Sequence, residues 1–133
     1  MRSQPAGIAL IGAGRMARVH AKTIGAVGGR LVIVFDVVES AAASLAIDTG
    51  ALVAHNIEEA LHHPDVATVL VVTSSNTHVD CIIQAVETGK VVMCEKPLAP
   101  NLSDARRCVD ALVSEQAMFF SRSIGGSIQG MQR

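Results

Sequence analysis

The sequence is nearly free of aromatic residues, with no Trp, no Tyr and three Phe among 133 residues. Half of the residues are nevertheless hydrophobic, so a core has to be built from Val, Ile, Leu and Ala. Such side chains fill parallel sheets that are covered by helices on both faces. A chain of this length can bury about two-thirds of the surface that its unfolded form exposes, so we expect one domain with a true core.

An excess of charge of one sign and long hydrophobic runs are also missing. The net charge is −1, and no cluster of Lys and Arg is long enough to follow a nucleic-acid backbone or an anionic membrane. No apolar run approaches the roughly 18 residues that would suggest a membrane span. We therefore expect a cytoplasmic protein with a small-molecule partner, no nucleic acid and no membrane. The sequence leaves open whether the chain forms a homo-oligomer.

The cysteines do not form a pattern that binds metal. Cys81, Cys94 and Cys108 are widely spaced and lack a C-x-x-C arrangement. An odd number of separated cysteines fits reduced thiols in a cytosol better than a disulfide framework or a zinc site. We expect each of them to be a small core residue and predict no metal site.

Apolar runs alternate with segments of helical spacing along most of the chain. We expect strands at residues 7–11, 31–35, 52–54, 66–72, 91–94 and 118–120. We expect helices at residues 15–26, 40–49, 57–62 and 77–88, and a further helix that begins at Asn101 or Ser103 and runs to residue 116. This alternation predicts an α/β fold with a doubly wound parallel sheet, the Rossmann type.

A glycine motif lies between the first expected strand and the first expected helix. Residues 12–17 read G-x-G-x-x-A. Gly12 permits a tight turn, and Gly14 has no side chain to keep a pyrophosphate away from the backbone. The helix that starts at Arg15 and Met16 offers free N–H groups and partial positive charge to phosphates. The motif predicts a dinucleotide site, although a glycine-rich turn that binds nothing has the same pattern.

Asp36 ends the second expected strand, about twenty residues beyond the glycines, where an acidic side chain accepts hydrogen bonds from the adenosine ribose. A carboxylate there repels a 2′-phosphate, and the sequence around it contains no arginine to receive one. We therefore predict NAD rather than NADP as cofactor. The alternative is a strand-end acid exposed to solvent.

Polar residues follow the fourth and fifth expected strands. In a doubly wound sheet the carboxyl ends of the strands form the ligand crevice, so these side chains are expected to converge where a nicotinamide would lie. Lys96 is the candidate proton carrier among them, because a lysine beside a cationic nicotinamide can have a lowered pKa. The alternative is a surface lysine in a loop. The residues concerned are Thr73, Ser74, Asn76, His78, Glu95 and Lys96.

Taken together, G-A-G-R-M-A-R-V-H at residues 12–20, T-S-S-N-T-H at residues 73–78 and E-K-P at residues 95–97 resemble the Gfo/Idh/MocA oxidoreductases, over about residues 6–121. The resemblance implies hydride transfer from a secondary alcohol of a polyol or sugar to NAD. It implies that Lys96 contacts the reacting hydroxyl and that the bond before Pro97 is cis. It further implies cofactor contacts from Gly12, Gly14, Arg15, Met16, Asp36, Thr73, Ser74, Asn76, His78 and Glu95.

The chain departs from the family at its far end. Family members continue into a second domain that binds the substrate and supplies an Asp and a His to the proton relay. From the sequence we expect an NAD-binding domain that lacks this C-terminal substrate domain and is inactive alone. A non-catalytic NAD(H)-binding or sensing module, or a truncated product without function, are the alternatives.

Residues 122–133 are expected to be a tail that follows the NAD-binding domain of residues 1–121. Members of the family carry Phe-Asn-Arg-Arg-Phe-Asp-Pro after the sixth strand. The codons of residues 123–129 are compatible with that peptide when they are read one base earlier. We therefore expect a one-base frame change here and a tail that packs poorly, which sequencing of the gene would test.

Overall fold

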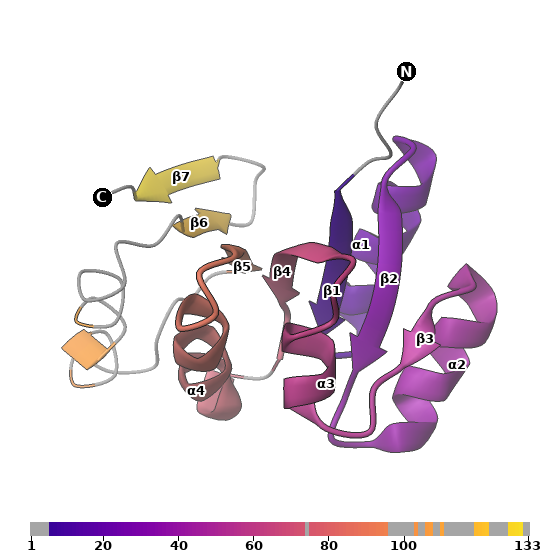
Figure 1. The fold of residues 1–133 in the computed structure, drawn as a ribbon, viewed down its shortest axis with the longest axis horizontal. Helices are drawn as coiled ribbons and strands as arrows, with labels where there is room; N and C mark the ends of the chain where they lie inside the picture. The colour runs from indigo at the N-terminus through magenta and orange to yellow at the C-terminus, as the bar shows by residue number, and fades with distance from the viewer. Residues whose placement is uncertain are drawn as a thin grey trace.

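A computed structural model describes residues 6–73, 75–95, 103, 106, 107, 110, 119–122 and 128–131. Strands and helices alternate along these residues as the sequence predicted (Figure 1). Their bounds are β1 (Gly7–Ile11), α1 (Arg15–Ala26), β2 (Arg30–Phe35), α2 (Glu39–Thr49), β3 (Leu52–Val53), α3 (Ile57–Leu61), β4 (Val66–Val71), α4 (Ser75–Val86), β5 (Val91–Glu95), β6 (Phe119–Arg122) and β7 (Ile128–Met131). Most of the helix expected after β5 lies outside the described residues.

The described strands form one sheet in the order β3-β2-β1-β4-β5-β6-β7. The pairs from β3 to β6 are parallel, which confirms the doubly wound α/β fold. The chain runs outward from β1 through β2 to β3, then returns to β4 on the other side of β1. The strand order therefore reverses between β1 and β4, and in such sheets the ligand crevice lies at the carboxyl ends of the strands at that reversal.

One strand lies beyond the expected domain boundary. Ile128–Met131 forms β7, which pairs antiparallel with β6 so that Phe119 faces Met131 and Arg122 faces Ile128. The sequence analysis expected no strand in this tail. An edge strand has unpaired N–H and C=O groups, and β7 satisfies one row of these on β6.

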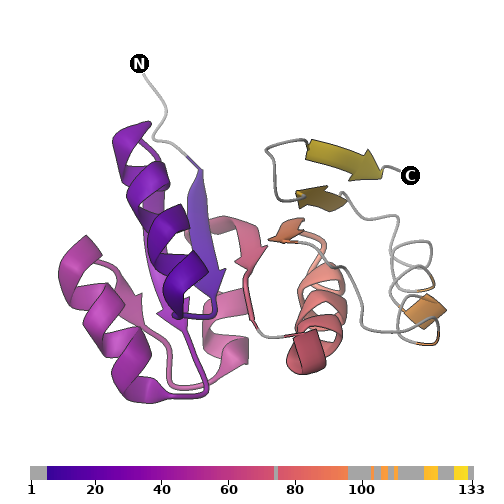
Figure 2. The same ribbon diagram turned by 180° about the vertical axis from the view of Figure 1, so that it is seen from behind.

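The side chains of β1 point alternately to the two faces of the sheet and join two separate cores. Ala9 and Ile11 lie in a core under α3 and α4, with Val69, Val92 and Ile82 among its members. The core on the other face lies under α1 and α2 (Figure 2), and its buried residues are Leu10, Ala13, Ala17, Ala21, Val34, Ala42, Leu45 and Leu70. The described chain is therefore a three-layer structure with helices on both faces.

The short helix α3 is held at both ends by polar contacts. Asn56 caps its start by accepting a hydrogen bond from the Glu59 N–H at 2.9 Å. At its end, the Lys90 Nζ donates to the carbonyl oxygens of Leu61 at 2.6 Å and His63 at 3.3 Å. Partial burial lowers the pKa of Lys90. Lys90 thereby links the start of β5 to the end of α3.

The cysteines in the described part of the chain lie in or against the core. Cys94 is buried and Cys81 is half-buried, while Cys108 is outside the described residues.

No cluster of three or more His, Cys, Asp or Glu with metal-binding geometry occurs among the described residues. Within that same part of the chain, no helix has the length and apolar character needed to cross a membrane.

Candidate cofactor site

Gly12 joins the ends of three strands. Its φ is 113°, in the region that favours glycine. Its N–H donates to the Phe35 carbonyl oxygen at 2.7 Å, and a Cβ placed on it would lie 2.8 Å from the Val72 carbonyl oxygen. A side chain at Gly12 would therefore force β1 and β4 apart at the point where the strand order reverses.

Gly14 is a glycine for a different reason. A Cβ at Gly14 would have no atom of the described residues within 4 Å, so packing does not require glycine here. Gly14 is the residue that precedes α1, and among the described residues α1 has neither a side-chain cap nor an acidic residue in its first turn. The first N–H groups of α1 are thus free to bind an anion that approaches past Gly14.

Ala17 explains how the start of α1 lies so close to the sheet. The residue is only 1% exposed and belongs to the alanine-rich core beneath α1 and α2. A small residue at this position allows the helix axis to approach β1 closely. In the G-x-G-x-x-A motif, Gly12 therefore fits the junction of the strands, Gly14 leaves the start of α1 open to a ligand, and Ala17 lets α1 pack closely on the sheet.

Asp36 binds the glycine loop directly. Its Oδ2 accepts a hydrogen bond from the Ala13 N–H at 2.7 Å, and its Oδ1 accepts one from the Val38 N–H at 2.8 Å. Each carboxylate oxygen can accept more than one hydrogen bond, so these contacts leave capacity for a ribose hydroxyl. Asp36 thus fixes the loop between β1 and α1 in addition to any contact with a ligand, a role that the sequence analysis did not foresee.

Thr73 provides a polar atom without a partner at the end of β4. Its Oγ1 is buried, and no described residue makes a hydrogen bond of ordinary geometry with it. Its neighbour is the Cys81 thiol of α4, a weak hydrogen-bonding group. Burial raises the pKa of Cys81, while the contact with Thr73 partly offsets that rise and Asp80 adds to it. A buried hydroxyl whose neighbour is a weak hydrogen-bonding group is poorly satisfied, which costs free energy at this end of β4.

The remaining predicted residues are only partly placed by the structure. Asn76 and His78 lie in the first turn of α4, which begins at Ser75, whereas the sequence analysis expected the helix to begin at residue 77. Glu95 is the last residue of β5, which pairs with β4. The predictions for Ser74 and Lys96 fall outside the described residues.

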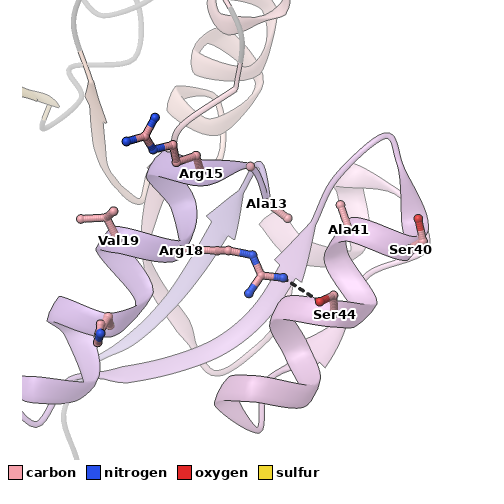
Figure 3. A pocket seen from close by; sticks show the side chains of 9 residues that line it. Ala13, Arg15, Arg18, Val19, Ser40, Ala41 and Ser44 are labelled. Carbon is pink, nitrogen blue, oxygen red and sulfur yellow. Dashed lines mark hydrogen bonds between the residues drawn. The ribbon is translucent and has the colours of Figure 1, made fainter.

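A cavity of about 700 Å³ lies beside the glycine loop, between α1 and the start of α2. Figure 3 shows Arg18 reaching from α1 toward α2, where its guanidinium donates to Ser44 Oγ at 2.6 Å. The described hydrogen bonds of Asp36 are to the backbone of Ala13 and Val38, while Arg18 bonds Ser44 and Asp48 of α2. Ala13, which is bonded to Asp36, lines the same cavity as Arg18.

Comparison with known proteins agrees with this geometry. Residues 6–123 match the family model described as an oxidoreductase family with an NAD-binding Rossmann fold. The chain is 37% identical over 111 residues to inositol 2-dehydrogenase of Agrobacterium fabrum, an alignment that covers 80% of this chain and 33% of that protein. The chain thus spans about a third of the length of the curated relatives it matches.

Solved structures give the same result. The myo-inositol dehydrogenase of Lactobacillus casei, in complex with NAD(H) and myo-inositol, superposes with a TM-score of 0.78 at 32% identity, over 83% of this chain and 34% of that one. GenD2 from gentamicin A biosynthesis, in complex with NAD, superposes with a TM-score of 0.81 at 31% identity, over 90% of this chain and 34% of that one. The glycine loop, the strand order and these matches together show that the chain belongs to the Gfo/Idh/MocA family of oxidoreductases, within its NAD-binding Rossmann domain.

Proposed function

We propose that this chain is the NAD(H)-binding part of a dehydrogenase that takes hydride from a secondary alcohol of a polyol or sugar. The observation that carries the proposal is the glycine loop at the reversal of strand order, with the uncapped start of α1 on one side and Asp36 on the other. An anion-binding helix start beside a ribose-binding acid suits a dinucleotide.

The relatives support the substrate class. The Agrobacterium fabrum protein is an inositol 2-dehydrogenase, and the Lactobacillus casei structure contains both NAD(H) and myo-inositol. A polyol is therefore the first substrate class to test, beginning with myo-inositol, the compound in the Lactobacillus casei structure.

Each residue has a proposed role. The backbone N–H groups around Gly14, Arg15 and Met16 hold the pyrophosphate, while Gly12 holds the loop in place. Asp36 accepts from the adenosine ribose and favours NAD over NADP by repelling a 2′-phosphate. Bound NAD would supply the hydride acceptor. The polar residues on the nicotinamide side are Thr73, Ser74, Asn76, His78 and Glu95, and Lys96 handles the proton of the reacting hydroxyl.

Titration with NADH, followed by nicotinamide fluorescence, tests cofactor binding by the 133-residue chain. Gly14→Val places a side chain in the open approach to α1 and is expected to weaken NADH binding by more than about tenfold. Gly25→Val on the same helix is the matched control, since a Cβ there also has no described atom within 4 Å. Equal affinity of the two variants would contradict the proposed site.

Activity is tested separately by following NADH formation from NAD and myo-inositol. Turnover supports the dehydrogenase. NADH binding without turnover on any polyol favours a cofactor-binding module only when it is found in a protein that joins this chain to a relative's substrate domain, because the chain spans about a third of the length of its relatives. Lys96→Met is expected to leave NADH affinity within about tenfold while abolishing turnover in a protein in which this chain is joined to a substrate domain. Near-normal turnover of this variant would remove Lys96 from the reaction.

A further inference from the structure

A second cavity, of about 560 Å³, lies between α1 and α2 at the far end of these helices from the glycine loop. Figure 2 shows the two helices side by side on one face of the sheet. Most of the residues that line the cavity belong to the second halves of α1 and α2, and Leu31 joins them from the start of β2. No described residue from 12 to 17 lines it. The cavity is therefore near the amino ends of the strands, away from the crevice at their carboxyl ends.

The floor of this cavity is apolar. Ala21 is 6% exposed and Leu45 is 2% exposed, while Ile24 and Leu31 are half-buried beside them. The space stays open because α1 has small residues on this side, and a Cβ at Gly25 would have no described atom within 4 Å. A ligand that covered Ile24 and Leu31 would remove their remaining apolar surface from water, which is favourable.

Two cations and one carboxylate lie around this floor. Arg18 donates to Asp48 Oδ2 at 2.9 Å and to Ser44 Oγ at 2.6 Å, so the carboxylate of Asp48 already has a cationic partner. Lys22 lies one turn further along α1, and no described residue forms an ion pair or a hydrogen bond with it. The charged residues of the cavity therefore have one positive charge in excess, on the Lys22 ammonium.

These features define the chemistry of a fitting ligand. Sites for small molecules have volumes of about 300–1,000 Å³, are mostly apolar and have a few polar groups that orient the ligand. An apolar floor beside one unpaired ammonium suits a molecule with an apolar body and a single negative charge. A phosphate dianion suits it less well, because Asp48 borders the same space and would repel the second charge.

We propose that this cavity binds an amphipathic monocarboxylate, such as a medium-chain fatty acid. Its carboxylate accepts hydrogen bonds from the Lys22 ammonium, and its alkyl chain lies on Ile24 and Leu31. The inference goes beyond the proposed function and does not depend on it, because the cavity and the glycine loop lie at opposite ends of α1.

Calorimetric titration of the 133-residue chain with octanoate tests the ligand class. 1-Octanol and octylammonium have the same alkyl chain without the negative charge, so they are the matched probes. Octanoate is expected to bind at least about threefold more tightly than 1-octanol, and octylammonium more weakly than either. Equal binding of the three probes would overturn the proposal, since the chain would then take up alkyl groups regardless of charge.

Lys22→Met tests the cation while keeping a long side chain on α1. It is expected to weaken octanoate binding by at least about threefold and to leave 1-octanol binding unchanged. Arg107→Met is the control for loss of one positive charge, because Arg107 is exposed in an ion pair with Asp80 and does not line the cavity. Circular-dichroism melting checks that both variants fold.

Two glycine variants separate this cavity from the cofactor site. Gly25→Val places a side chain at the cavity and is expected to weaken octanoate binding by at least about fivefold, with NADH binding unchanged. Gly14→Val is expected to do the opposite, because Gly14 does not line this cavity. If Gly25→Val does not fold, Lys22→Met decides the question alone.

The outcomes distinguish this inference from the proposed function. No octanoate binding by the unmodified chain at up to about 10 mM overturns the cavity site and leaves the cofactor proposal standing. Failure to bind NADH, with octanoate bound as expected, overturns the cofactor proposal alone. Octanoate binding that neither Lys22→Met nor a folded Gly25→Val variant weakens also overturns the inference, since the ligand would then lie elsewhere on the chain.

Discussion

The two faces of the sheet are packed with different residues. Under α3 and α4 the core contains fully buried Val and Ile, including Val69, Ile82 and Val92. Under α1 and α2 half of the buried residues are alanine, and two cavities of about 700 and 560 Å³ lie between these helices. One face is therefore filled by large side chains, while the other brings two helices close to the sheet and leaves space between them.

This difference separates stability from ligand binding. Large apolar side chains remove more surface from water, so the face under α3 and α4 contributes more free energy per residue. Small residues such as Ala17 instead let α1 start next to the strand ends, where its N–H groups meet the crevice. The loop and helix start proposed to hold the pyrophosphate lie at the edge of this alanine-rich face, whereas Asn76 and His78 lie in α4, which covers the other face.

The largest expected effect is on the densely packed face. Ile82→Ala removes a side chain with 0% exposure and is expected to lower the free energy of unfolding by about 2–5 kcal/mol. Urea unfolding measures this. Ile47→Ala, at a position that is 83% exposed on α2, is the control and should change little. Similar losses for the two variants would contradict the assignment of the main core to this face.

The next effect tests the need for small residues under α1. Ala17→Leu overpacks a site that is 1% exposed and is expected to cost about 1–3 kcal/mol of unfolding free energy. It should also weaken NADH binding, because the start of α1 moves away from the glycine loop. Ala26→Leu, on an exposed position of the same helix, should do neither. Normal NADH affinity in a folded Ala17→Leu variant would show that close packing of α1 is not needed.

A smaller effect is expected from removing the hydrogen bond between the Asp36 carboxylate and the glycine loop. Asp36→Ala leaves the N–H of the buried Ala13 without its acceptor, at a cost of about 1 kcal/mol. NADH and 2′-deoxy-NADH should then both bind less tightly, and the gap between NADH and NADPH should narrow. Asp65→Ala is the control on an exposed ion pair. Unchanged affinity for 2′-deoxy-NADH would mean that Asp36 acts on the ribose alone.

The smallest effect concerns the half-buried thiol of Cys81 in α4. Burial, the largest cause, raises the pKa of Cys81 above its ordinary value of 9.0. The folded state therefore keeps the proton longer than the unfolded state, so the free energy of unfolding should fall as the pH rises above about 9. Cys81→Ala should flatten that dependence in urea unfolding followed at several pH values. An unchanged slope would exclude Cys81 as its source.

The bounds of β1 and α1 were predicted to the residue, because a glycine turn and a change of hydrophobic period mark them clearly. The start of α4 was placed two residues too late, since Ser75 and Asn76 resemble a loop in composition but form the first turn of the helix. Strand β7 was missed because pairing with β6 depends on the edge that β6 offers and not on a pattern within residues 128–131.

By itself, the sequence determined the alternation of strands and helices, the glycine motif and the acid at the end of β2. These are local signals, because they depend on the hydrophobic periodicity of short segments and on the spacing of the glycines and Asp36 along the chain. Only the tertiary structure decided that Asp36 accepts a hydrogen bond from the Ala13 N–H, that Gly12 lies against Val72 and that Arg18 donates a hydrogen bond to Ser44. These contacts join residues that are more than twenty positions apart, and they exist because parallel strands bring distant loops to one edge of the sheet.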